Sequence, residues 1–214
     1  MNCMTLDSIS FDHSAAIDGL IERSFEAFKP PERLTVSEWA VRHRRLSPEG
    51  SAFTGRFRLE IAPYQAEPME AINHPDVQSI VLQWSSQSGK SEVILCALGY
   101  FISEEPSPML VLQPTLDMAE TFSKDRLAPM IRDTPVLTEL VADPKARDQG
   151  NTVLHKRFKG GHITLAGANS PASLSSRPIR ILACDECDRY PHSSMAEGDP
   201  ITLASKRTDT FFNS

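Results

Sequence analysis

The sequence predicts an α/β fold with a mostly parallel central sheet flanked by helices, and three observations support this class. Short β-rich runs alternate with longer helical runs along most of the chain, which is typical of parallel sheets. A turn of small residues, 85–89, separates a β-rich run from an apolar helix. A later apolar run ends in two carboxylates, Asp185 and Glu186. With 214 residues, 40% of them hydrophobic, the chain can bury the core of one such domain.

The composition argues against a nucleic-acid-coating protein, a membrane protein and a secreted protein. The formal net charge is −6, whereas a protein that coats nucleic acid non-specifically is usually basic, so any nucleic-acid contact must come from local patches. No apolar run approaches the roughly 20 residues that span a bilayer. The first residues lack the basic start and apolar stretch of a signal peptide. We therefore expect no membrane segment and a cytoplasmic location.

Residues 1–60 are predicted to form a helical adaptor segment in front of the main domain. Residues 1–33 are expected to form a weak amphipathic helix that Pro30-Pro31 stops. Ser37 is the expected N-cap of a second, short helix, and the basic cluster Arg42-His43-Arg44-Arg45 falls near its end, where cations are favoured. This cluster is interpreted as a solvated helix end, with contact to DNA or a partner as the alternative.

The main domain, residues 61–214, is predicted to alternate helices and strands. Two of its strand-like runs are joined at Gly160-Gly161 and are expected to form a hairpin. The predicted helices are residues 63–73, 92–103, 114–132 and 203–207, and the predicted strands are residues 77–84, 109–112, 152–158, 162–165, 179–184 and a further start at 210–212.

The cysteines do not predict a metal centre. Cys184 and Cys187 form a C-x-x-C pair, but no second pair and no histidines at ligand spacing accompany it. We expect reduced thiols, with Cys184 at the end of a buried strand and Cys187 in the following turn.

The segment Ser85-Ser86-Gln87-Ser88-Gly89-Lys90-Ser91 predicts a phosphate-binding loop, or P-loop. Such a loop follows a strand and opens a helix, and its backbone N–H groups cradle the phosphates of a nucleotide. Lys90 would reach the β- and γ-phosphates, and the Ser91 hydroxyl would bind Mg²⁺. Trp84 stands where the general pattern has a glycine. The alternative is an ordinary strand-to-helix turn with a solvated lysine.

The acidic strand end supplies the complementary chemistry. Asp185 would complete the Mg²⁺ shell, often through water, and Glu186 would polarise the attacking water. An Asp-Glu pair after a strand is by itself usually a solvated turn, so the prediction depends on the P-loop upstream.

The P-loop with its missing glycine resembles the deviant phosphate loop of the lambda-type terminase large subunit family, which often reads Ser-x-Gln-x-Gly-Lys-Thr. The resemblance runs from about Thr35 to the C-terminus. Its other blocks are Arg44-Arg45-Leu46-Ser47-Pro48-Glu49-Gly50, Ala62-Pro63-Tyr64-Gln65, Gln113-Pro114-Thr115-Leu116-Asp117-Met118-Ala119-Glu120, Phe122-Ser123-Lys124-Asp125-Arg126-Leu127, Ala168-Asn169-Ser170-Pro171 and Asp185-Glu186.

The resemblance implies further site residues. Tyr64 and Gln65 match the element that binds the adenine of ATP, with a ring to stack and an amide to read the base edge; alternatively they are a core residue and a helix-surface residue. Arg177 matches an arginine implicated in triggering hydrolysis, which makes it a catalytic candidate beside Lys90 and Glu186; the alternative is a loop arginine. Gln113-Pro114-Thr115 resembles a DNA-contacting motif of related helicases, or Thr115 is simply a helix cap.

The resemblance also implies a function. Such proteins are ATP- and Mg²⁺-dependent motors that package double-stranded viral DNA in the cytoplasm of the host bacterial cell. Their partners are the small terminase subunit and the portal of the procapsid, and they act as homo-oligomers when full length. Because the chain ends at Ser214, we expect an ATPase fold that is incomplete at its C-terminus and lacks the family's nuclease domain.

Two alternatives remain at this point. Asp185-Glu186-Cys187-Asp188 also fits the D-E-x-D box of a superfamily-2-type helicase. The chain could instead be an inactive prophage-derived fragment that binds nucleotide or partners. Because multimeric motors often need neighbouring subunits for hydrolysis, we expect an isolated monomer to be inactive.

Overall fold

The computed structural model describes Ile17, Ile21 and Ser24, and then residues 33–141, 151–170, 178–193 and 198–211. The chain divides into two compact units, Met1–Arg33 and Leu34–Ser214. The boundary therefore falls at Arg33 and not after residue 60, because residues 34–60 contribute Val36, Trp39 and Phe57 to the core of the second unit.

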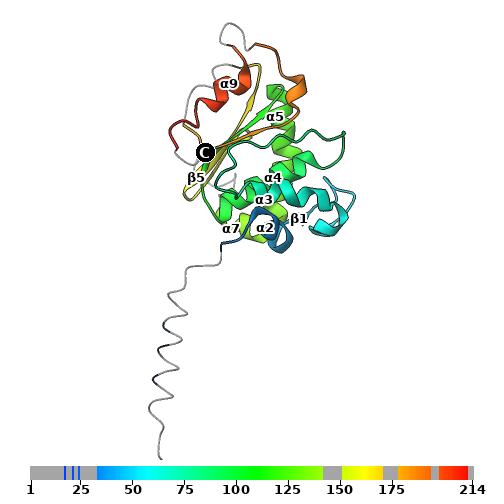
Figure 1. The fold of residues 1–214 in the computed structure, drawn as a ribbon. Helices are drawn as coiled ribbons and strands as arrows, with labels where there is room; N and C mark the ends of the chain where they lie inside the picture. Colours follow the sequence, from blue (N-terminus) through cyan, green and yellow to red (C-terminus); the bar gives the residue numbers. More distant parts are fainter. Residues whose placement is uncertain are drawn as a thin grey trace, which may run out of the picture. The chain divides into compact units, whose positions relative to one another are not determined.

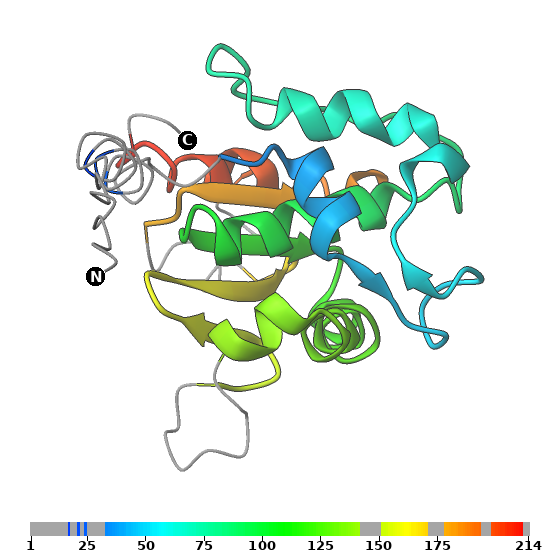
Figure 2. The same cartoon turned by 90° about the horizontal axis from the view of Figure 1, so that it is seen from below.

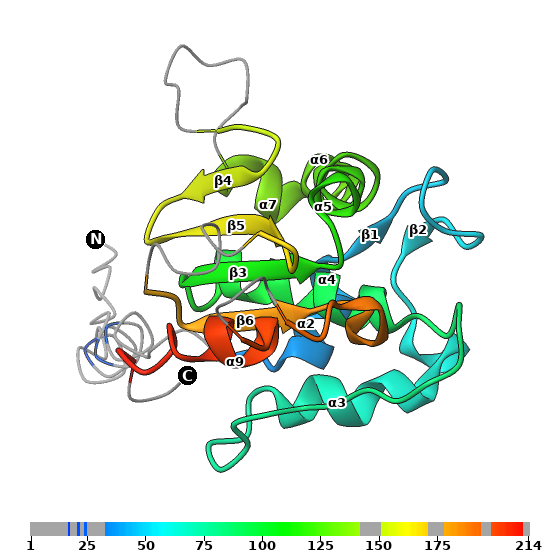
Figure 3. The ribbon, with the colours of Figure 1, turned by 90° about the horizontal axis from the view of Figure 1, so that it is seen from above.

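A four-stranded sheet forms the centre of the second unit, in the order β4-β5-β3-β6 (Figure 3). Strands β5 (Gly161–Gly167) and β6 (Ile181–Cys184) both pair in parallel with β3 (Pro108–Gln113), and β4 (His155–Phe158) is antiparallel to β5. The expected mostly parallel sheet and the expected hairpin are confirmed.

Helices cover both faces of this sheet. Helix α4 (Lys90–Ser103) lies in front of the sheet in Figure 2 and behind it in Figure 3, and α9 (Pro200–Ser205) lies on the opposite face. Because side chains alternate along a strand, Met109 and Val111 belong to the cluster with α4, whereas Leu110 and Leu112 belong to the cluster with α9. The continuous apolar runs of the buried strands follow from this two-sided burial.

Helix α2 (Val36–His43) packs against α4 (Figure 1). Thr35, and not the expected Ser37, is its N-cap: the Thr35 side chain accepts from the backbone of Glu38, and Glu38 accepts from the backbone of Thr35. Trp39 is fully buried, and its indole N–H donates to Ser103 Oγ of α4 at 2.7 Å. A Cβ added to Gly99 would overlap the Trp39 ring, so the two helices approach closely at this glycine.

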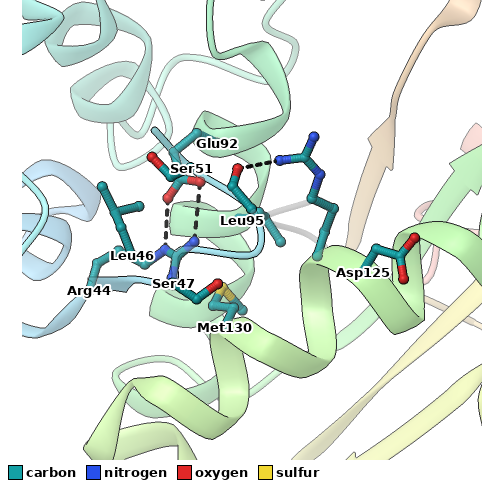
Figure 4. A pocket seen from close by; sticks show the side chains of 10 residues that line it. Arg44, Leu46, Ser47, Ser51, Glu92, Leu95, Asp125 and Met130 are labelled. Atoms are coloured by element: carbon teal, nitrogen blue, oxygen red, sulfur yellow. Dashed lines mark hydrogen bonds and ion pairs between the residues drawn. The ribbon is translucent and has the colours of Figure 1, made fainter. Parts of the chain in front are cut away.

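The connection after α2 is fixed by a buried ion pair. Arg44 Nε donates to Glu92 Oε1 at 2.7 Å and Nη2 donates to Oε2 at 3.1 Å (Figure 4). Arg44 is only 5% exposed, so neither a solvated position nor a DNA contact fits this member of the basic cluster. Nearby, Arg126 donates to the carbonyl of Gly50 at 2.7 Å. Removing one member of a buried pair leaves the other charge uncompensated. The Arg44–Glu92 contact therefore stabilises the packing of residue 44 against α4.

The predicted strand at residues 77–84 is wrong, because the described structure has no strand there. A strand needs a ladder of backbone hydrogen bonds, and within the described part of the chain no backbone–backbone bond joins residues 78–84 to a neighbouring strand. Leu82 and Trp84 pack on the core, while Val81 is 86% exposed. The segment is therefore an irregular and mostly exposed connection that holds to the core through Leu82 and Trp84, and it leads directly into the predicted P-loop.

The other elements largely follow the predicted pattern. The predicted helix 114–132 is a continuous helical run with a π-helical turn in its middle. Residues 208–210 form a turn where a strand start was expected, and Phe212 lies outside the described residues. None of the helices in the described ranges is long and apolar enough to cross a membrane. The remaining bounds are β1 Arg45–Leu46, β2 Gly55–Arg56, η1 Leu59–Ile61, η2 Pro63–Gln65, α3 Ala66–Ala71, α5 Leu116–Phe122, η3 Ser123–Leu127, α6 Ala128–Asp133, α7 Pro135–Leu140 and η4 Cys187–Arg189.

Candidate functional site

The loop at residues 85–89 connects the irregular segment 77–84 to α4. Two of its residues have positive φ, Gln87 at 57° and Gly89 at 83°, and Gly89 is the residue before the first helical residue, Lys90. The described residues offer no acceptor to the backbone N–H groups of Gly89, Lys90 and Ser91. Unpaired N–H groups at a helix N-terminus suit an anion such as a phosphate.

The Lys90 side chain folds back over this loop. Its Nζ donates to the carbonyls of Trp84 and Ser85, both at 2.8 Å. The ammonium group is thus held on the loop backbone instead of extending freely into solvent. A polyphosphate in the loop would offer charged acceptors for the same group, which carbonyl oxygens cannot match in strength.

Tyr64 and Gln65 both donate hydrogen bonds to the loop backbone. The Tyr64 hydroxyl donates to the carbonyl of Ser88 at 3.0 Å, and Gln65 Nε2 donates to the carbonyl of Gly89 at 3.3 Å. The Tyr64 ring also meets Trp84 edge to face, with centroids 5.2 Å apart. The structure therefore places both residues that were predicted to contact adenine at the loop. Their side chains donate hydrogen bonds to the loop backbone there.

Asp185 lies directly opposite the start of α4. It is 7% exposed, and its Oδ2 accepts from Ser91 Oγ at 2.9 Å and from Gln113 Nε2 at 3.5 Å. Its Oδ1 accepts from the backbone N–H of Glu186 at 3.1 Å. All three donors are neutral, and no cationic side chain of the described residues pairs with this carboxylate.

A buried carboxylate next to a hydroxyl matches the oxygen ligands that Mg²⁺ prefers. Because burying an unpaired negative charge is costly, a divalent cation between Ser91 and Asp185 would also supply the missing positive charge. The residues present thus fit the ion. No group of three or more possible metal-ligating residues occurs in the described ranges, so water and phosphate oxygens would have to complete the shell.

Glu186 adopts the left-handed backbone conformation, with φ 52°. Arg189 Nη1 lies 3.0 Å from Glu186 Oε2, although the approach is not aligned as a hydrogen bond. Positive φ at a residue other than glycine costs about 1–3 kcal/mol and is concentrated at functional sites.

The sequence motif placed Gln113 in a possible DNA contact, whereas the structure places its side chain against Asp185. Gln113 is 3% exposed, ends β3 and points its amide at Asp185. The parallel register pairs Leu112 with Cys184, so the following residues of the two strands lie side by side. That adjacency could have been anticipated from the parallel sheet. Thr115 is the N-cap of α5, as in the capping alternative, and Arg177 lies outside the described residues.

The two cysteines beside the acidic pair are free, Cys184 half-buried and Cys187 exposed. Burial raises the pKa of the Cys184 thiol to about 12 and also raises the pKa of Cys187 above its usual value. Cys96 is fully buried in α4, and burial raises the pKa of its thiol as well. None of the three is therefore a reactive thiolate near neutral pH.

We expect iodoacetamide at pH 8 to label Cys187 before Cys184 and Cys96, as measured by peptide mass mapping. Only the thiolate reacts, and access favours the exposed residue. Since all three pKa values are raised, labelling should accelerate as the pH increases from 8 to 10. Faster labelling of Cys184 than of Cys187 would contradict the burial assigned here.

The fold and the site together define a class: an α/β protein whose loop and helix N-terminus suit a phosphate-bearing ligand, with a carboxylate that suits a divalent cation beside them. Residues 51–214 match the family described as phage terminase large subunit gpA, ATPase domain, so the chain belongs to this family. The resemblance inferred from the sequence motifs is confirmed, and nothing favours the helicase alternative.

Two relatives show the same affiliation. The terminase large subunit of Enterobacteria phage P21 is 29% identical over 180 residues, and that of Escherichia phage lambda is 28% identical over 180 residues. Each alignment covers 84% of this chain but 28% of the relative. The chain thus spans little more than a quarter of the length of these relatives.

Proposed function

We propose that this chain is a Mg²⁺-dependent P-loop ATPase domain that powers the movement of viral DNA into a capsid. The observation that carries the proposal is the hydrogen bond between Ser91 and Asp185, which joins the helix after the loop to the acidic strand end. In a chain of the terminase ATPase family, this juxtaposition is the arrangement that a nucleotide with its metal ion requires.

The side chains divide the work as follows. The backbone N–H groups of residues 85–89 and of the first turn of α4 bind the phosphates, and Lys90 neutralises the charge on the β- and γ-phosphates. Ser91 and Asp185 hold Mg²⁺, which when bound shields the phosphate oxygens. Glu186 orients and deprotonates the attacking water. Arg177 stabilises the charge that develops on the transferred phosphoryl group, within one subunit or across a subunit boundary.

The partners follow from the same assignment. We propose that the protein acts in the host cytoplasm on double-stranded viral DNA, together with a small terminase subunit and a portal. Hydrolysis would take place in a homo-oligomer, so that the isolated chain binds nucleotide with little turnover. An endonuclease activity, where present, would reside in another part of the full-length protein.

The Ser91–Asp185 pair gives a direct test. Asp185→Asn should remove most of the gain in ADP affinity that Mg²⁺ provides, because a neutral amide cannot balance the cation. Loss of such a partner typically weakens metal affinity by roughly tenfold to a hundredfold. Calorimetric titration with ADP, with Mg²⁺ and with EDTA, measures this gain for each variant.

The control is Asp76→Asn, which removes an exposed carboxylate on a turn and should leave the Mg²⁺ dependence unchanged. An Asp185→Asn protein with the full Mg²⁺-dependent gain would exclude this residue as the metal ligand. A wild-type protein that binds no nucleotide under any condition would sink the ATPase assignment itself.

A further inference from the structure

Two neighbouring side chains hold two consecutive carbonyl groups of the P-loop. Tyr64 donates its hydroxyl to the carbonyl of Ser88, and Gln65 donates its amide to the carbonyl of Gly89. The first-turn donors of α4, Glu92 N and Val93 N, also bond to the Gly89 carbonyl, at 3.1 and 3.3 Å. Hydrogen bonds therefore fix the orientation of the Ser88 and Gly89 carbonyl groups.

A fixed carbonyl also fixes the N–H group of the same peptide, because the peptide unit is planar. The peptide that carries the Ser88 carbonyl carries the N–H of Gly89, and the peptide with the Gly89 carbonyl carries the N–H of Lys90. These are two of the N–H groups that lack an acceptor among the described residues. Tyr64 and Gln65 thus orient the donors that a bound phosphate would use.

The burial of Gln65 supports this role over reading of the base. Its side chain is 4% exposed, and a Cβ added to Gly89 would overlap its Nε2 atom. An amide in this position must leave the loop before it can reach the edge of a base. Tyr64, by contrast, is 53% exposed, so a ligand can reach its ring while the hydroxyl stays on the loop.

We propose that Tyr64 and Gln65 are positioning residues that hold two peptide units of the P-loop in the orientation needed for phosphate binding. They therefore set the affinity for the diphosphate moiety of a nucleotide equally for adenine and guanine. The inference rests on the proposed nucleotide binding, but it makes a separate statement about which part of the ligand these side chains act on.

The test compares ADP and GDP, each with Mg²⁺, by calorimetric titration of the whole chain. Gln65→Met and Tyr64→Phe each remove one hydrogen bond and keep the side-chain volume. Both variants should bind ADP and GDP more weakly by about threefold to tenfold, the range of one net hydrogen bond. The ratio of the two dissociation constants should stay at its wild-type value.

Gln83→Met is the matched control, because it removes an exposed amide on the segment before the loop; it should bind both nucleotides like wild type. Tyr64→Phe changes an exposed side chain, so it decides the matter if Gln65→Met does not fold. Residues that only stabilise the fold would leave both affinities unchanged below the melting temperature.

Three results would overturn the inference. Unchanged affinities in Tyr64→Phe and Gln65→Met would show that the hydrogen bonds do not orient the loop. A Gln65→Met protein that loses affinity for ADP but not for GDP would identify Gln65 as a reader of the base. Wild-type protein that binds neither nucleotide would reject the proposed function, and this outcome is distinct from the other two.

Discussion

Under the proposed function, Lys90→Ala should weaken ATP binding by about tenfold to a hundredfold and abolish ATP hydrolysis. A hydrogen bond to a charged group contributes roughly 1.5–3 kcal/mol, which corresponds to this change in affinity. The substitution removes a cation that is held on the loop, where Nζ is 2.8 Å from the carbonyls of Trp84 and Ser85. Equilibrium binding of a fluorescent ATP analogue and release of phosphate measure the two effects.

Lys124→Ala provides the comparison. Its ammonium group forms an exposed ion pair with Glu120 at 2.9 Å, on the helix that follows β3. Such a pair contributes little, so this variant should bind nucleotide like wild type. Equal nucleotide binding by wild type and Lys90→Ala would refute the assignment of the P-loop, whatever the control shows.

The second large effect concerns stability. Trp39→Ala should lower the free energy of unfolding by about 3–5 kcal/mol, as truncation of a buried aromatic residue generally does. Trp39 is fully buried against Gly99 of α4, and its indole N–H donates a hydrogen bond to the Ser103 hydroxyl. The cavity would lie directly behind the helix that opens with Lys90 and Ser91. Urea unfolding followed by circular dichroism gives the free energy.

Val41→Ala on the same helix is the matched control, since Val41 is 43% exposed. Substitutions of this kind usually change stability by no more than about 0.5 kcal/mol. A loss below about 1 kcal/mol in Trp39→Ala would mean that α2 does not pack on α4 as described.

The sheet could be predicted largely from the sequence, because its signals are local. The apolar run at 109–112 and the Gly160-Gly161 turn specify β3 and the hairpin β4–β5 without reference to other segments. Residues 77–84 carry the same local signal but form no strand, because pairing depends on a neighbour that local composition does not reveal. Burial of Arg44 was missed for a related reason: its partner, Glu92, is distant in the sequence.

The site shows the same division. The proximity of Ser91 and Asp185 follows from a known requirement of phosphate chemistry, so two motifs sufficed to anticipate it. The contact of Gln65 with the Gly89 carbonyl has no such signature, because it joins residues 24 positions apart through tertiary packing. Gln113 was noticed for another reason, and only the parallel register places its amide on Asp185.

The close contact of Trp39 with Gly99 has a practical consequence for anyone who shortens this protein. The match to the family model begins at residue 51, which is after α2 has ended. A version that starts there would keep the P-loop and the acidic pair. It would lose the indole that covers the middle of α4 and the arginine that neutralises Glu92. The start of the family match therefore does not coincide with the start of the second compact unit, and a shortened version should begin near Leu34.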